Sequence, residues 1–166
     1  NGLIARLADL SLRSSVTGAD IPSHEIATID TNTSRPLVDR VAQMAAAFEA
    51  YVSKRPDISG IIALGGSSGS AVASPGLRAL PLGIPKILVT TMASGDVSPY
   101  IRGSDVIVIP SVADISGLNR ITGQILANAA SSLSGMVRAR QKAGQIDSDR
   151  ASVALSMFGI TNPCVT

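Results

Sequence analysis

Two observations predict an α/β fold, a Rossmann-like parallel sheet flanked by helices. First, short apolar runs alternate with helical patterns along the chain. Second, hydrophobic residues make up 45% of the 166 residues but aromatic residues only 2%, so aliphatic side chains must fill the core. Aliphatic cores of this kind are typical of parallel strands that helices cover on both faces. Right-handed crossovers are expected to join the strands.

Apolar runs of strand length appear at several places along the chain. The first run, LIARLADLSL, mixes apolar and polar residues and also suits a short helix, because Ala, Leu and Arg favour helices. The others are apolar and end at turn residues, as buried strands do. The predicted strands are residues 3–12, 58–64, 86–91, 106–109 and 151–158.

Helical patterns separate these runs. The clearest begins near Pro36, after which apolar residues recur at helical spacing. The longest carries many small residues beside its apolar stripe, so it is expected to pack on the sheet or on a second subunit. The predicted helices are residues 22–27, 34–54, 71–80 and 114–141.

The pattern predicts one nucleotide-binding α/β domain over residues 1–143. The polar segment 144–150 contains a glycine, as linkers often do, and residues 151–166 are expected to begin a second α/β domain. The chain opens on an apolar run without an initiator Met, so we expect the first domain to be incomplete at its N-terminus and the second to be cut short.

Charge and composition exclude several classes. The net charge of +2 comes from mixed signs, without a basic tract interleaved with aromatic residues, so no nucleic-acid partner is expected. No apolar run reaches the roughly 18 residues that a membrane span needs, so no membrane partner is expected. A lone cysteine, Cys164, precludes an internal disulfide and favours a cytoplasmic location. The lone histidine, His24, is expected on the surface rather than in a catalytic group.

Ligands of parallel sheets bind beyond the carboxyl ends of the strands, where three loops of this chain are expected to meet. The first loop follows strand 58–64. Gly65 and Gly66 are expected to adopt backbone angles closed to other residues, and Gly69 to leave room for a ligand. The following helix would turn its N–H groups and positive dipole end toward an anion. The candidate anion-binding residues are Gly65, Gly66, Ser67, Ser68, Gly69 and Ser70.

The spacing in this loop fits neither the dinucleotide fingerprint G-x-G-x-x-G nor the lysine-containing phosphate loop. The alternative to an anion site is therefore a tight strand-to-helix turn that the glycines merely permit.

The second loop follows strand 86–91 and offers Thr91, Ser94, Gly95 and Asp96 as candidate ligand-binding residues. Asp96 could hold Mg²⁺ directly or through water beside a nucleotide phosphate. The alternative is an Asx-turn or a helix cap, which is common for an aspartate after Ser-Gly.

The third loop enters the long helix. Asp114 is expected to cap that helix rather than to bind a ligand. Asn119 and Arg120 lie in its first turns, where they could reach toward a ligand, with a solvated face as the alternative.

Five motifs occur in order along most of the chain from residue 20 onward. They are GIIALGGSSGS at 60–70, LRALPLGIPK at 77–86, TMASGD at 91–96, DISGLNRI at 114–121 and MFGITNPCV at 157–165. In these motifs the chain resembles the ATP-binding domain family named for the tomato resistance protein against tomato mosaic virus, whose bacterial members are mostly uncharacterised.

The resemblance implies an N-terminal α/β domain that binds ATP with Mg²⁺, a C-terminal α/β domain, and a homodimer. In that layout the present chain would begin near the second strand. Ser68 and Ser70 stand where the family often has Gly and Thr, so the hydroxyl is kept at Ser70 while Ser68 lowers the freedom of the backbone.

The leading functional hypothesis is a nucleotide-binding protein of unknown reaction. One alternative is an interaction module with a structural nucleotide, since the resistance relative acts by binding a viral replication protein. Another is a metabolic enzyme that holds a different small phosphorylated or carboxylated ligand. The absence of a phosphate-loop lysine and of a clear general base argues against a fast NTPase.

Overall fold

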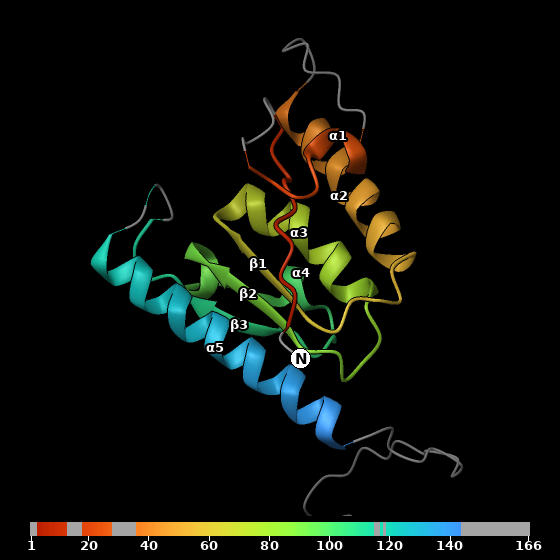
Figure 1. Ribbon diagram of the computed structural model, residues 1–166. Coiled ribbons are helices and arrows are strands. Elements are labelled where there is room, and N and C mark those ends of the chain that lie inside the picture. The colour runs from red at the N-terminus through yellow and green to blue at the C-terminus, as the bar shows by residue number, and fades with distance from the viewer. Residues whose placement is uncertain (1–2, 13–17, 28–35, 115–116, 118, 144–166) are drawn as a thin grey trace, which may run out of the picture.

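The computed structural model describes residues 3–12, 18–27, 36–114, 117 and 119–143. Three parallel strands form one sheet in the order β1-β2-β3, flanked by helices on both faces (Figure 1). This confirms the predicted α/β class with a parallel sheet. The strands are β1 Ile61–Gly65, β2 Lys86–Thr90 and β3 Ile107–Pro110.

The central strand β2 carries the core on both of its faces. Ile87 and Val89 are fully buried and pack with residues of α5, which spans Arg120–Ala143. Leu88, between them, packs in a second cluster with residues of α3, which spans Ser67–Ala79. Alternate side chains therefore point to opposite helical layers, as the pleat of a strand requires.

A second helix covers α3 on its side away from the sheet. This helix, α2, spans Leu37–Ser53 and buries Met44, Phe48 and Val52 against a cluster that includes Val72 of α3 (Figure 1). A Cβ added to Gly76 of α3 would lie 2.4 Å from the Phe48 ring. The two helices therefore approach each other too closely for any side chain at that position.

The remaining elements are short. They are α1 Ser23–Ile26, the 3₁₀ helix η1 Thr91–Ser94, and α4 Ser98–Ile101. The exposed His24 lies in α1, as expected of a surface histidine. No helix within the described ranges is long and apolar enough to cross a membrane.

The predicted strand over residues 3–12 is wrong. This segment makes a single parallel bridge, Ala8 with Ile21, closed by hydrogen bonds from Asp9 N to Ile21 O (2.9 Å) and from Ile21 N to Leu7 O (3.0 Å). Ala8, Leu10 and Leu12 pack against the α1–α2 side of the core instead of entering the sheet, whereas Leu3, Ile4 and Leu7 are exposed. Packing without a ladder partner leaves the segment irregular.

Two of the predicted helices begin at other residues than expected, in both cases at the carboxyl ends of the strands. α3 begins at Ser67 rather than at residue 71, and α5 begins at Arg120 rather than at residue 114. The predicted linker 144–150, the run 151–158 and Cys164 lie outside the described residues.

An ion pair between a buried lysine and an exposed aspartate closes the amino end of the sheet. Lys86, the first residue of β2, is fully buried, and its Nζ donates to Pro81 O (2.8 Å) and to Asp105 Oδ1 (2.5 Å). The Gly83 N–H donates to the other carboxylate oxygen of Asp105 (2.7 Å). Burial alone would raise the pKa of Asp105, but these hydrogen bonds outweigh it and hold that pKa below its usual value.

Candidate functional site

The carboxyl ends of the three strands lie side by side, as predicted. Gly65 at the end of β1 pairs with Thr90 of β2, and Thr90 pairs with Pro110 of β3. The β2–β3 ladder extends one step further, since Ser111 N donates to Thr90 O (3.1 Å). The three predicted loops therefore leave the sheet at one edge, where an open parallel sheet binds its ligands.

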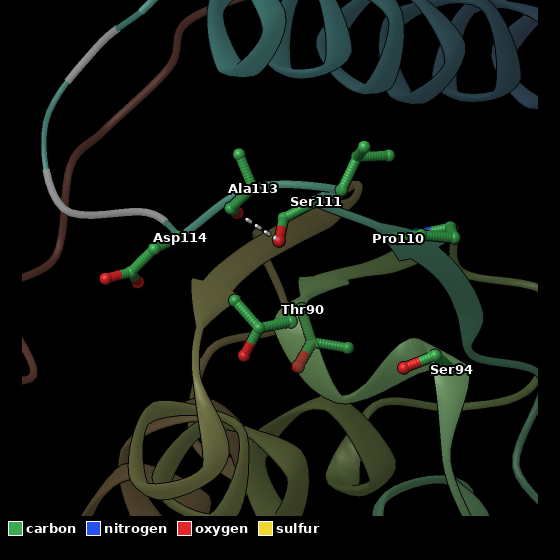
Figure 2. A pocket seen from close by; sticks show the side chains of 8 residues that line it. Thr90, Ser94, Pro110, Ser111, Ala113 and Asp114 are labelled. Carbon is green, nitrogen blue, oxygen red and sulfur yellow. Dashed lines mark hydrogen bonds between the residues drawn. The ribbon is translucent and has the colours of Figure 1, made fainter.

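A pocket of about 430 Å³ opens at this edge between the loops that follow β2 and β3 (Figure 2). This volume falls in the range of small-molecule sites, roughly 300–1,000 Å³. The buried Thr90 and Ser111 form its floor, and in Figure 2 Ser94 and Asp114 stand at opposite sides of the opening. Its lining residues are Thr90, Thr91, Ser94, Pro110, Ser111, Val112, Ala113 and Asp114.

The predicted anion loop is largely the first turn of a helix. Gly65 ends β1, Gly66 is the N-cap of α3, and Ser67 begins the helix. Neither glycine has a positive φ, so the expectation that they use backbone angles closed to other residues is wrong. Gly65 is required for a different reason. A Cβ there would lie 2.7 Å from the backbone carbon of Gly69, so the helix backbone crosses directly over it.

Gly66 and Gly69 have no comparable internal constraint. A Cβ on Gly66 would meet only Thr91 Oγ1, at 3.5 Å, and one on Gly69 would meet only Leu64 O, at 3.6 Å. Both distances are ordinary van der Waals contacts, so the described structure would accept a small side chain at either position. Gly69 nevertheless lacks one inside a helix, where glycine costs about 0.5–1 kcal/mol relative to alanine.

Ser70, predicted to face a ligand, is fully buried instead. Its Oγ lies 2.7 Å from Thr90 Oγ1, which also accepts a hydrogen bond from Met92 N (3.0 Å). Ser74 Oγ in turn donates to Ser70 O (2.5 Å). This chain of hydroxyls fixes the first turn of α3 against the end of β2 and against the start of η1. Ser67 and Ser68 are exposed at the helix terminus.

The loop after β2 divides between the pocket and a turn. Thr91 and Ser94 line the pocket, and Gly95 follows η1 as its C-cap. Asp96 is exposed and accepts hydrogen bonds from Ser98 N (2.9 Å) and from the Ser98 hydroxyl, which together lower its pKa. The predicted alternative, an Asx-turn, is therefore present at Asp96. Within the described residues, no three His, Cys, Asp or Glu side chains are grouped to hold a metal.

The loop after β3 contains a strained turn. Val112 has φ +64°, which is an outlier for a β-branched residue, and its side chain is 77% exposed. Ser111 holds the turn from both sides: Ala113 N donates to Ser111 O (2.7 Å), and Ser111 Oγ donates to Ala113 O (2.7 Å; Figure 2). Backbone strain of this kind persists only where the surroundings impose it, and it is common at ligand sites.

The expected cap of the long helix is wrong. Asn119, not Asp114, caps α5, because its Oδ1 accepts from Ile121 N (2.9 Å) and from Thr122 N (3.0 Å). These capping hydrogen bonds engage the Asn119 side chain, which was predicted to reach a ligand. Arg120 is exposed in the first turn of α5. Asp114 is instead part of the pocket wall.

The structure thus brings Thr91 and Ser94 together with residues that the sequence had not singled out. Thr90 and Ser111 each stand directly after an apolar run, and that position at the carboxyl edge was the signal that could have found them. Gly66, the N-cap of α3, does not line the pocket, but a Cβ built on it would lie 3.5 Å from Oγ1 of the lining residue Thr91. Asp96 and Arg120 are not among the lining residues.

The chain is similar to proteins that carry one family designation. The N-terminal domain of the uncharacterised protein family UPF0261 matches residues 1–142. A UPF0261 protein of Rhizobium meliloti is 37% identical over 166 residues, covering 96% of this chain and 41% of the relative. One from Mesorhizobium japonicum is 48% identical over 126 residues, covering 76% of this chain and 31% of the relative.

A plant protein is also similar. The ToMV resistance protein Tm-1 of Solanum lycopersicum is 40% identical over 131 residues, which covers 75% of this chain and 17% of that protein. The chain therefore spans less than half the length of these relatives. The match over residues 1–142 and the identities to bacterial and plant relatives agree with the resemblance seen in the motifs, and the chain belongs to the UPF0261 family.

Proposed function

We propose that this domain binds a nucleotide, ATP by the family resemblance, with its phosphates at the N-terminus of α3. The observation that carries the proposal is the pair Gly66 and Gly69. Neither glycine has a positive φ, and neither is forced by internal packing. A close approach by a ligand from outside gives a reason for both, because phosphates on a helix terminus contact the backbone itself.

The electrostatics of the α3 terminus support an anionic ligand. The first turn of α3 contains no acidic residue, and no side chain caps it at Gly66. The first N–H groups of a helix lack intrahelical partners, and the helix dipole adds about half a positive charge there. The exposed hydroxyls of Ser67 and Ser68 supply further donors at the same end.

For Mg²⁺ we propose Asp96 as the protein ligand. Its carboxylate is exposed, and the hydrogen bonds from the Ser98 hydroxyl and from Ser98 N lower its pKa. Mg²⁺ commonly takes one or two carboxylates together with phosphate oxygens and waters, so one aspartate beside a bound triphosphate is a sufficient protein contribution.

The wider proposals have two sources: the homodimer is implied by the family resemblance, and the location and the excluded partners follow from the composition and charge of the chain. We propose a cytoplasmic homodimer with no nucleic-acid or membrane partner, and we leave the reaction of any enzyme in it undefined. The second candidate function is an interaction module with a structural nucleotide, which the name of the plant relative, a resistance protein against ToMV, favours. The third is an enzyme for another small phosphorylated or carboxylated ligand.

The test is a thermal-shift panel on the complete protein with ATP, ADP, NAD and sugar phosphates, with and without Mg²⁺. At a ligand concentration about 100 times Kd, ATP should stabilise the protein by about 2.7 kcal/mol. The variant Gly66→Asp should abolish this stabilisation, because it places a carboxylate where the phosphates would lie. No shift with any nucleotide would sink the proposal.

A matched variant separates ligand repulsion from general damage. Gly135 lies exposed on α5 with nothing within 4 Å of an added Cβ, so Gly135→Asp introduces the same charge away from the site. This control should keep the full ATP shift. If Gly66→Asp instead lowers the midpoint without ligand and keeps the shift, the glycine serves only the turn.

A further inference from the structure

We propose that the pocket after β2 and β3 is a sugar subsite, in which Asp114 accepts hydrogen bonds from the hydroxyls of a ribose. This inference rests on the proposed nucleotide function and assigns a ligand class to a part of the edge that the phosphates would not occupy.

The chemistry of the lining selects a neutral, hydroxyl-bearing group. Thr91 and Ser94 contribute hydroxyls, those of Thr90 and Ser111 being engaged in internal hydrogen bonds, and Asp114 contributes the one carboxylate among the residues that line the pocket. No lysine or arginine is among these lining residues. A phosphate here would meet a negative charge without a cation to balance it, whereas the O–H groups of a sugar donate well to a carboxylate.

Thr91 lies between the pocket and the proposed phosphate site. Thr91 lines the pocket, and its Oγ1 lies 3.5 Å from the place of a Cβ on Gly66, the N-cap of α3. A ligand with its phosphates on α3 would therefore pass Thr91 and extend into the pocket. The pocket volume of about 430 Å³ is large enough to hold more of the ligand than one sugar hydroxyl.

The strained turn supplies an apolar wall to the same pocket. Val112 lies in the wall with 77% of its surface exposed, beside Pro110 and Ala113. A β-branched residue held at a positive φ in the wall of a pocket is accounted for if a ligand packs against that turn. A nucleoside is complementary to both parts of the pocket: its ribose hydroxyls can donate to Asp114, and its flat base can pack against Val112.

The experiment measures binding of ATP, 2′-deoxy-ATP, 3′-deoxy-ATP and inorganic tripolyphosphate to the complete protein by calorimetry. The wild type should bind ATP about tenfold or more tightly than the weaker of the two deoxy forms, the ratio expected for a hydrogen bond to a charged acceptor. Asp114→Asn should lose this preference by weakening ATP alone. Tripolyphosphate should bind the variant at least as well as the wild type.

The outcomes separate the two proposals. If ATP and both deoxy forms bind equally well and Asp114→Asn changes nothing, the sugar subsite is wrong while the phosphate site stands. If neither ATP nor tripolyphosphate binds the wild type, both proposals fail. Asp39, exposed on α2 and absent from the pocket lining, provides the matched control, and Asp39→Asn should keep the wild-type preference for ATP.

Discussion

The two ends of the sheet differ in whether their polar groups are paired within the protein or face an open pocket. At the amino end, the Lys86 ammonium is buried and is paired with Asp105 and with Pro81 O. At the carboxyl end, hydroxyls line an open pocket, Gly66 and Gly69 have no internal reason to be glycine, and Val112 is strained. One end is closed by its own contacts, and the other is left open.

The contrast separates stability from binding within one sheet. A buried charge needs its partner, because an uncompensated ion in the interior is very costly. Strain and uncovered apolar surface, in contrast, lower stability and are retained where a ligand uses them. Variants at the amino end should therefore lower stability and leave ligand affinity unchanged. Variants of the carboxyl-end residues that no internal contact fixes, such as Gly69, should weaken ligand binding without lowering stability.

The largest expected effect is at the amino end. Asp105→Asn removes the only carboxylate shown to pair with Lys86 in the described residues and leaves a buried ammonium bound to Pro81 O. Breaking a buried pair costs about 3–5 kcal/mol, and the 38% exposure of the Asp105 side chain reduces this to about 2–3 kcal/mol. Urea unfolding measures the loss, and ATP affinity should not change. A loss of affinity at constant stability would contradict the division between the two ends.

The same pair gives a pH dependence with a definite sign. The pKa of Asp105 is lower in the folded protein than its ordinary value of about 3.9, so the pair contributes its full stability above that value. The contribution is lost as the pH falls through the folded pKa. The gap in urea midpoint between wild type and Asp105→Asn should stay constant from pH 7 to about 5 and narrow below about 4. A gap that widens on acidification would refute the assignment.

The next effect compares two glycines at the carboxyl end. Gly65→Ala forces a Cβ against the Gly69 backbone at 2.7 Å and should lower stability by about 1–2 kcal/mol. Gly69→Ala meets only an ordinary contact, and the gain in helix propensity should raise stability by about 0.5 kcal/mol. Thermal unfolding measures both changes.

The ligand then completes the comparison. Gly69→Ala should weaken ATP binding by about tenfold, because the added methyl group lies at the helix terminus where the phosphates approach. A more stable protein that binds less well is the signature of a residue kept for function. If Gly69→Ala gains stability and binds ATP as before, Gly69 is not part of a phosphate site.

The sequence predicted the parts of the fold that depend on periodic burial. β1, β2, β3, α2 and α5 were located because apolar side chains recur at strand or helical spacing along them. The prediction failed at residues 3–12, where Ala8, Leu10 and Leu12 do pack on the core but the backbone makes one bridge at Ala8 rather than a sheet ladder. Periodicity reports burial and does not report the hydrogen-bond partner.

The candidate site was predicted by its place and only partly by its residues. The rule that ligands meet the carboxyl ends of parallel strands located all three loops. It could not foresee that Ser70 would turn inward to Thr90 or that Asn119 would cap α5 in place of Asp114. Nearby polar side chains compete for the same backbone hydrogen bonds, and the free-energy differences between the alternatives are small. The sequence alone does not show which side chain makes the bond.

A small change in stability, of either sign, is expected at Val112. Glycine adopts a positive φ without the steric cost of about 1–2 kcal/mol that a β-carbon incurs, but it gains flexibility in the unfolded chain. Val112→Gly should therefore alter the free energy of unfolding by less than about 1 kcal/mol. It also removes an apolar side chain that is 77% exposed in the pocket wall, so ATP should bind more weakly while tripolyphosphate binds as before. Calorimetry with both ligands distinguishes these roles, since an equal loss for both would mean that Val112 shapes the whole edge rather than the nucleoside end of the site.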